Sequence, residues 1–149
     1  MGYINDIRKY IGHAPMLSAG AAVVVIKDKK ILLNLRSDTL NWGIPAGSME
    51  LGETFEQTAA RELMEETNLS VNEFKFLTLF SGEEYFFKYP NGDELYTVIA
   101  LYQALDFEGE LRINDGESRE LRYFGKDELP ELESRSEKML NWIIENGVL

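Results

Sequence analysis

The sequence predicts a mixed α/β domain in which a mixed β-sheet lies between helices. Apolar, β-branched segments at 18–27 and 30–36 are typical of strands, whereas residues 55–67 and 133–146 have the spacing of amphipathic helices. No repeat, linker or low-complexity tract interrupts the 149 residues, so we expect one domain over 1–149. A chain of this length buries about 68–70% of its unfolded surface, which is enough for one core and one cleft.

The first predicted element is a short helix over residues 3–11. Isoleucines recur on one side of it, and the Gly/Pro-containing segment 12–15 stops it. Residues 18–27 and 30–36 then form β-segments joined by the polar pair 28–29, so we expect a hairpin.

The main helix is predicted over residues 55–67. The extended piece 42–47, broken by proline and glycine, leads into a turn at 50–53, and Thr54 is placed to cap the helix. Its residues are good helix formers. We expect its apolar side to consist of Ala59, Ala60, Leu63 and Met64.

The second half of the chain reads as four strands followed by a helix. The strand-like segments are 73–80, 84–89, 95–104 and 119–125, with a hairpin turn at 89–93. The final helix, over 133–146, presents a packing face of Met139, Leu140, Trp142, Ile143 and Ile144.

Composition limits the chemistry to oxygen ligands. The chain has no cysteine and one histidine, His13, which excludes thiolate chemistry, Cys-ligated metals and a two-His metal site within one chain. His13 lies in a Gly/Pro-punctuated connection, where a solvated or capping histidine is the ordinary outcome.

Charge and hydropathy limit the partners. Lys and Arg number 15 against 26 Asp and Glu, giving a net charge of −11. Such a chain repels nucleic acid and anionic membranes, so we expect neither as a partner, and an anionic substrate needs a bridging cation. The most apolar run, 19–26, is too short to cross a bilayer, and the N-terminus has no secretory h-region. A cytoplasmic location is expected by default.

Residues 47–69 place three carboxylates on one predicted helix. Glu62, Glu65 and Glu66 are separated by about one turn, which brings their Cβ atoms to about 5–6 Å on one side. Like charges this close repel by roughly 1–3 kcal/mol per pair, and a divalent cation offsets this. Carboxylates without His or Cys suit Mg²⁺ or Mn²⁺ rather than zinc. Gly47, which has no Cβ, can bring its backbone carbonyl close to the same cation.

Arg61 has a different task in this stretch. It stands two turns after Glu53 and one before Glu65, so its guanidinium can fork between carboxylates and fix the turn against the helix. The alternative, that these glutamates are the solvated face of an amphipathic helix, is the usual meaning of a charge run. The fixed spacing of the whole set from Gly47 to Leu69 favours the metal interpretation.

Residues 47–69 resemble the Nudix box of the Nudix hydrolase family. The resemblance rests on Gly47, Glu53 and the run 61–69, in which Asn68 replaces the final glycine but tolerates the left-handed conformation of a helix end. It implies an α/β/α sandwich with a mixed β-sheet. It also implies Mg²⁺- or Mn²⁺-dependent hydrolysis of a nucleoside diphosphate linked to another moiety.

The resemblance also implies roles for individual residues. Glu65 and Glu66 match the principal metal-binding carboxylates, and Glu62 matches one that binds metal or takes the proton from water. Glu53 and Arg61 match the supporting pair.

Many members of the family resemble one another in placing an extra glutamate on a later loop, where this chain offers Glu117 and Glu120. We favour Glu117 as a catalytic residue, because neighbouring Gly116 lets the loop approach closely. Glu120 begins a strand of unknown register.

Substrate choice lies outside the box. Arg36 is a candidate phosphate ligand or a strand cap. Tyr85 and Phe87 are the predicted residues that stack a base, and the other aromatic candidates for this role are Trp42, Phe86 and Tyr89. Aromatic residues at strand spacing are more often core. The sequence leaves open ADP-ribose, a nucleotide sugar, a dinucleoside polyphosphate or a nucleoside triphosphate, the attacked phosphorus, the number of metal ions and dimerisation.

Two other functions compete with hydrolysis. A catalytically silent Nudix-like domain that only binds a nucleotide is expected to have lost box carboxylates, and this chain retains them. A calcium-binding module at residues 114–117 lacks the alternating ligands of an EF-hand loop.

Overall fold

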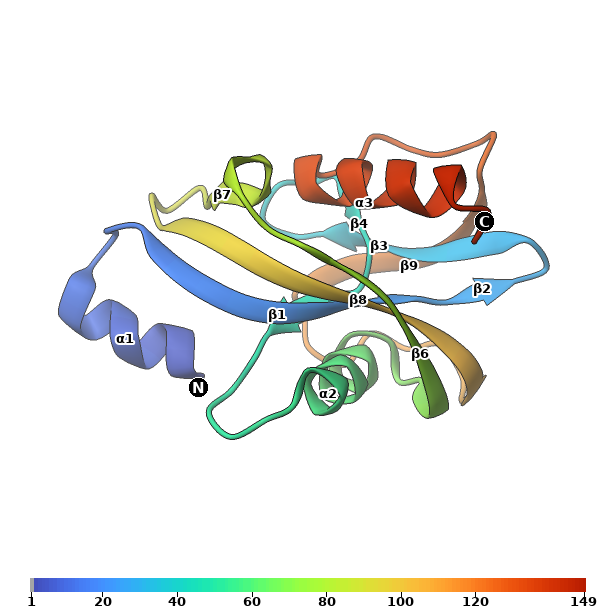
Figure 1. Cartoon of the computed structure of the whole chain (residues 1–149), viewed down its shortest axis with the longest axis horizontal. Coiled ribbons are helices and arrows are strands. Elements are labelled where there is room, and N and C mark those ends of the chain that lie inside the picture. Colours follow the sequence, from blue (N-terminus) through green and yellow to red (C-terminus); the bar gives the residue numbers. More distant parts are fainter. Residues whose placement is uncertain (1) are drawn as a thin grey trace.

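A computed structural model describes residues 2–149 of the chain, which form two β-sheets with three α-helices around them (Figure 1). The helices are α1 (Tyr3–Ile11), α2 (Phe55–Thr67) and α3 (Ser134–Glu145), with a 3-10 turn η1 (Glu83–Tyr85). The strands are β1 (Met16–Val24), β2 (Ile26–Lys27), β3 (Lys30–Arg36), β4 (Trp42–Gly43), β5 (Ala46–Ser48), β6 (Ser70–Phe80), β7 (Phe86–Lys88), β8 (Glu94–Glu108) and β9 (Ser118–Gly125).

The larger sheet is mixed. Its strands run in the order β5-β1-β8-β6, with β7 also paired to β8. Strands β1 and β8 are parallel over nine residue pairs, from Met16 opposite Leu95 to Val24 opposite Gln103, while the other pairs are antiparallel. The second sheet, β2-β3-β4 with β9 paired to β3, is antiparallel throughout. The mixed sheet expected from the sequence is confirmed, with an antiparallel sheet beside it.

Alternating residues of β1 belong to two different apolar clusters. Ala22 and Val24 belong to the cluster that includes the buried side of α3, and Ala21 and Val23 to the cluster that includes α2. Because side chains of a strand point alternately to opposite faces, the sheet is covered on both faces. Figure 1 shows α3 and α2 on the two sides of the strands. The layered α/β/α arrangement is confirmed.

Local signals placed the turns and helix ends correctly. The β2–β3 hairpin turns through Asp28 and Lys29, whose φ angles are 53° and 63°, as a two-residue turn of the left-handed kind requires. Thr54 and Gln57 form a capping box at the start of α2. Asn68 ends that helix in the left-handed region, with φ 68° and ψ 14°.

The apolar side predicted for α2 is partly wrong. Ala59 and Leu63 are buried as expected, but Ala60 is exposed and Met64 is 39% exposed. Glu66 is buried instead, at 5% exposure. The helix is therefore rotated so that positions 59, 63 and 66 face the sheet, because these lie on one side at intervals of four and three.

The segment predicted as a strand over 84–89 begins instead with η1, and only Phe86–Lys88 extends as β7. The turn after it is closed by a hydrogen bond from the Tyr89 N–H to the Asp93 carbonyl of 2.8 Å. No helix within residues 2–149 is both long and apolar enough to span a membrane.

Candidate active site

A cleft of about 990 Å³ opens beside α2. One wall is the helix face that carries Glu62, Glu65 and Glu66, and strand β5 forms the floor beside it. Residues of β3, of the β7–β8 turn, of α1 and of the loop before β9 complete the rim. The three glutamates predicted as metal ligands therefore line one cleft.

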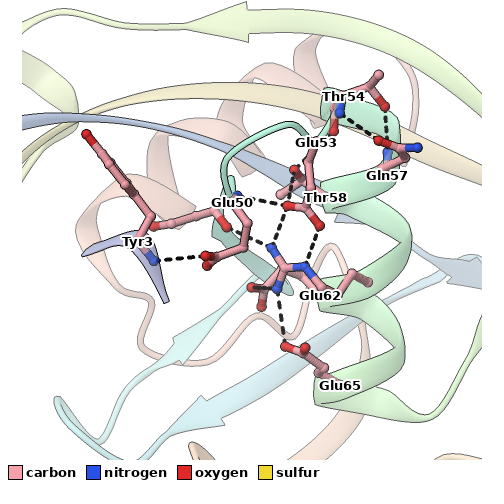
Figure 2. Close-up of polar contacts among 10 residues, drawn as sticks. Tyr3, Glu50, Glu53, Thr54, Gln57, Thr58, Glu62 and Glu65 are labelled. Atoms are coloured by element: carbon pink, nitrogen blue, oxygen red, sulfur yellow. Dashed lines mark hydrogen bonds and ion pairs between the residues drawn. The ribbon is translucent and has the colours of Figure 1, made fainter. Parts of the chain in front are cut away.

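Arg61 joins the β5–α2 loop to the helix. Figure 2 labels its partners Glu53 on the loop and Glu62 and Glu65 on the helix. The Nε and Nη2 of Arg61 donate to the two carboxylate oxygens of Glu53 at 2.7 and 2.8 Å, a bidentate pair. Its Nη1 donates to Glu62 at 2.7 Å and to Glu65 at 3.4 Å, and Nη2 also reaches the Ser48 carbonyl at 2.9 Å. The fork expected from the sequence is formed, and it fixes the loop against the glutamates.

Glu53 is held in its charged form. Its hydrogen bonds with Arg61, together with those from the Glu50 N–H at 2.8 Å and the Thr58 hydroxyl at 3.0 Å, lower the pKa of its carboxyl group to about 2, although burial acts in the opposite direction. A permanently ionised Glu53 gives Arg61 a fixed anchor.

Gly47 makes room for the carboxylate of Glu62. A Cβ built on Gly47 would lie 1.9 Å from the Glu62 carboxyl carbon, so any side chain at this position would displace that carboxylate. A Cβ on neighbouring Gly20 would lie 2.4 Å from the Gly47 carbonyl oxygen. Two glycines thus allow the strands and the helix to approach closely at the cleft floor.

Glu66 is a buried carboxylate with an unsatisfied atom. Its Oε1 lies 3.5 Å from the Asn34 side-chain nitrogen, which donates to the Ser118 hydroxyl at 2.8 Å. Its Oε2 is buried and has no hydrogen-bond partner of good geometry within residues 2–149, although the Ala46 backbone N–H acts to lower the pKa of this carboxyl group. Leaving a buried acceptor unpaired costs about 1–3 kcal/mol, and more for a charged group, which points to a partner that the polypeptide does not supply.

The cleft disfavours negative charge on these groups. Burial raises the pKa of Glu66 well above its ordinary value, and the charges of Glu62, Asp115 and Glu117 raise it further. Burial also raises the pKa of Glu62 to about 7, although its contact with Arg61 acts in the opposite direction. The site gains most from a cation that would neutralise both carboxylates.

The two loop glutamates differ in their position relative to the cleft. Glu117 lines the cleft, and partial burial there together with the charges of Asp115 and Glu65 raises its pKa. Glu120 instead pairs with Arg122, whose Nε donates to it at 2.9 Å, and is not part of the cleft lining. The geometry therefore brings Glu117, and not Glu120, toward the helix carboxylates.

Of the predicted substrate-binding residues Arg36, Tyr85 and Phe87, only Arg36 lines the cleft. It is held by Asp38 through two hydrogen bonds of 2.9 and 2.7 Å. Tyr85 is buried against Phe80 in the apolar core, with ring centroids 5.2 Å apart. Phe87 is 8% exposed and lies beneath the Arg135 guanidinium at 4.2 Å. Neither ring lines the cleft, which is the core placement that strand spacing favours.

The donor set fits a hard divalent cation. Its side-chain atoms are carboxylate oxygens, one of them unpartnered, and Mg²⁺ and Mn²⁺ prefer such ligands. Among residues 2–149, no group of three or more His, Cys, Asp or Glu side chains stands ready as a metal cage. Arg61 engages the carboxylates of Glu62 and Glu65, so a cation would compete with it for them.

Sequence reasoning missed several buried polar residues beside the cleft and in a second, smaller cavity. Asn34 and Ser118 are buried beside Glu66, and Glu133 and Arg135 form a buried pair, 2.8 Å apart, beside a smaller cavity of about 90 Å³. Asn34 had a signal, because it interrupts the apolar strand 31–35 and a buried strand rarely carries an amide without a partner.

Comparison with known proteins identifies the family. Residues 16–143 match the NUDIX domain. An ADP-ribose pyrophosphatase from Methanocaldococcus jannaschii is 33% identical over 142 residues, which are 91% of this chain and 78% of the relative. The crystal structure of MutT NUDIX hydrolase from Burkholderia pseudomallei has a TM-score of 0.72 and 25% identity, over 85% of this chain and 97% of that one. The chain belongs to the Nudix hydrolase family.

A third relative is longer. The NAD-capped RNA hydrolase NudC of Actinobacillus succinogenes is 34% identical over 126 residues, which are 79% of this chain. The match spans only 44% of that relative, so the two proteins share a domain rather than a full length.

Proposed function

We propose that this chain is a pyrophosphohydrolase that cleaves a nucleoside diphosphate linked to another moiety, with Mg²⁺ or Mn²⁺ as its cofactor. The observation that carries the proposal is the row of glutamates on α2 facing one cleft, with the buried Oε2 of Glu66 unpaired. The similarity to an ADP-ribose pyrophosphatase makes ADP-ribose the first substrate to test. Nucleotide sugars, dinucleoside polyphosphates and nucleoside triphosphates are the other members of the class.

The α2 face would hold the cation. Glu65 and Glu66 are its principal ligands in this proposal, Glu62 is a third ligand or a proton acceptor, and the Gly47 carbonyl adds a backbone oxygen. When bound, the cation neutralises pyrophosphate charge and acidifies the attacking water. Arg61 keeps the carboxylates in position through its contacts with Glu62 and Glu65.

Two further cleft residues have proposed tasks. Glu117 takes the proton from water at a carboxylate oxygen, for which its raised pKa brings it closer to neutral pH. Arg36 binds a phosphate of the substrate, because its guanidinium lies at the cleft and is oriented by Asp38.

A hydrolysis screen over the four substrate classes tests the proposal. Each is assayed with Mg²⁺ and with Mn²⁺, and released phosphate and AMP are measured separately, so that the products locate the cleaved phosphoanhydride bond. Cleavage of ADP-ribose to AMP and ribose 5-phosphate is the expected result. Saturable binding without turnover of any substrate would support the silent binding domain instead.

A further inference from the structure

Helix α1 forms part of the cleft wall without belonging to either core. Gly2, Ile4, Asn5 and Arg8 line the cleft, yet no residue of Tyr3–Ile11 is buried. Figure 1 shows the helix at one end of the molecule, with its first turn near the β5–α2 loop and its last turn toward the β7–β8 turn. Its position must therefore depend on contacts other than apolar packing.

The first turn of α1 is anchored on Glu50 (Figure 2). The Tyr3 N–H donates to Glu50 Oε1 at 2.8 Å. A Cβ on Gly2 would lie 2.7 Å from Glu50 Oε2, so a side chain there would push this carboxylate away. The Glu50 N–H in turn donates to Glu53, the partner of Arg61. One hydrogen-bonded chain thus joins α1 to the glutamates of α2.

The last turn of α1 is anchored on the opposite rim by Arg8. Its Nη2 donates to the Glu94 carbonyl at 2.7 Å, and its Nη1 donates to the carbonyls of Gly12 and Ala14 at 3.0 and 2.5 Å. Asp93 lies 3.7 Å from its Nε. Both terminal nitrogens of the guanidinium are engaged, while Nε is buried without a hydrogen-bond partner within residues 2–149. Arg8 therefore serves as a tether, and Ile4 and Asn5 remain on the cleft side.

The chemistry of Ile4 and Asn5 suits a neutral, hydroxyl-bearing group. Asn5 is exposed at the cleft and offers amide donors and an acceptor, which match sugar hydroxyls. Ile4 is half-buried and offers apolar contact to a ring face. Neither side chain carries the positive charge that phosphate recognition needs.

We infer that Ile4 and Asn5 bind the sugar-like moiety that is linked to the nucleoside diphosphate, and that α1 thereby helps to set substrate choice. The inference rests on the proposed function for its substrate class. The helix also lies outside residues 16–143, which match the NUDIX domain. It is therefore a part of this chain in which substrate preference can vary while the box stays unchanged.

Binding of an uncleavable probe tests this without relying on turnover. The probe is α,β-methylene ADP-ribose with Mg²⁺, measured by calorimetry on the full chain. Asn5→Ala and Ile4→Ala should each weaken binding about 5- to 10-fold, the effect of losing roughly one hydrogen bond or apolar contact. Tyr10→Ala is the matched control, because Tyr10 is on the same helix but 87% exposed and outside the cleft lining.

AMP is the second probe, because it keeps the nucleoside but lacks the second ribose of ADP-ribose, which is the sugar-like moiety. The parent and both cleft variants should bind AMP equally. In turnover of ADP-ribose, the same variants should raise KM with kcat unchanged, as expected when contacts to a non-reacting group are removed. Equal weakening of AMP and of the analogue would overturn the assignment to the sugar-like moiety.

The outcomes separate this inference from the proposed function. A parent that hydrolyses ADP-ribose, with both variants binding the analogue like the parent, overturns the inference alone. A parent that binds the analogue through Ile4 and Asn5 but hydrolyses no substrate overturns the proposed function and leaves the inference standing. A parent that does not bind the analogue overturns the inference.

Discussion

Glu66 shows how one residue combines two patterns in the same helix. The four-residue interval from Glu62 places it with the charged face, while the intervals from Ala59 and Leu63 place it with the buried side. The structure satisfies both, since Glu66 is 5% exposed and still lines the cleft. The sequence predicted the cluster of glutamates but not this burial, because the rotation of a helix is set by the sheet on which it packs.

Glu66→Gln should lower turnover by orders of magnitude and raise the melting temperature of the metal-free protein at pH 8. The folded carboxyl group has a raised pKa relative to 4.5. Its ionisation therefore costs nothing below about pH 4.5 and destabilises the fold increasingly as the pH rises above that value. Gln removes this cost, so the melting temperature should rise, and each 1 kcal/mol gained raises it by about 2–4 °C in a domain of this size. Thermal unfolding in EDTA at pH 5 and pH 8 measures it.

Glu56→Gln is the matched control for that experiment, because Glu56 lies on the exposed side of the same helix. It should change neither turnover nor the pH dependence of unfolding. A Glu66→Gln protein with parental turnover and a lowered melting temperature would show that Glu66 has a structural task only.

Glu117→Gln should slow turnover at saturating substrate by about 10²-fold or more, the usual scale for a positioned acid–base group, with a smaller effect on metal affinity. Glu120→Gln is its control and should behave like the parent, because Glu120 pairs with Arg122 away from the cleft. Steady-state kinetics with a metal titration tests both variants. If both turn over like the parent, the box residues carry the chemistry without this loop.

Tyr85 and Phe87 mark a limit of sequence reasoning at the residue scale. A ring that stacks on a base and a ring that fills a core have the same composition and the same strand spacing. Only the packing of Tyr85 against Phe80 and of Arg135 over Phe87 distinguishes the two uses. Contacts between residues distant in sequence therefore carried the information that the pattern lacked.

At the scale of elements, helix bounds were predicted best, because they depend on local sequence signals. The predicted bounds of α1 and α2 match the structure at 3–11 and 55–67, because caps and glycines act within a few residues. The pairing of β1 with β5, and the approach of Gly47 to Glu62, join segments that the sequence pattern does not connect. The box could thus be located from the sequence, but the shape of its cleft could not.

The β5–α2 loop should depend on pH through Glu53. Its pKa is lowered from 4.5 to about 2 in the folded chain, chiefly by Arg61. This contribution to stability is therefore present above pH 4.5 and lost as the pH falls toward 2. Glu53→Gln should lower the melting temperature at pH 7 by roughly 5 °C, as for one lost charged hydrogen bond of about 1.5–3 kcal/mol.

Unfolding of Glu53→Gln and of the parent, followed from pH 7 down to pH 2, measures this effect, and the two curves should converge at the acid end. Glu131→Gln, an exposed glutamate distant from the loop, provides the control. A constant difference at every pH would mean that the Glu53–Arg61 contact does not depend on the carboxylate charge.

At the scale of the whole molecule, the net charge of −11 and the carboxylates of the cleft both repel an anionic substrate. An anionic substrate approaches an acidic protein whose cleft carries three helix carboxylates. The cleft-lining cations Arg8, Arg36 and Arg61 are each paired with a carboxylate. Coulomb repulsion then opposes binding unless cations enter with the substrate. A metal requirement is therefore a prediction that follows from composition and one helix alone.

Divalent metal should therefore control both turnover and stability. Excess EDTA should abolish hydrolysis, and millimolar Mg²⁺ should restore it. Without substrate, Mg²⁺ should raise the melting temperature relative to KCl of equal ionic strength, since a ligand at tenfold its Kd stabilises the fold by about 1.4 kcal/mol. The rise should be smaller at pH 5 than at pH 8, because protons compete for Glu62, whose pKa is about 7, and for Glu66. Equal rates in EDTA and in Mg²⁺ would refute the metal requirement, and an equal rise in Glu66→Gln would place the cation elsewhere.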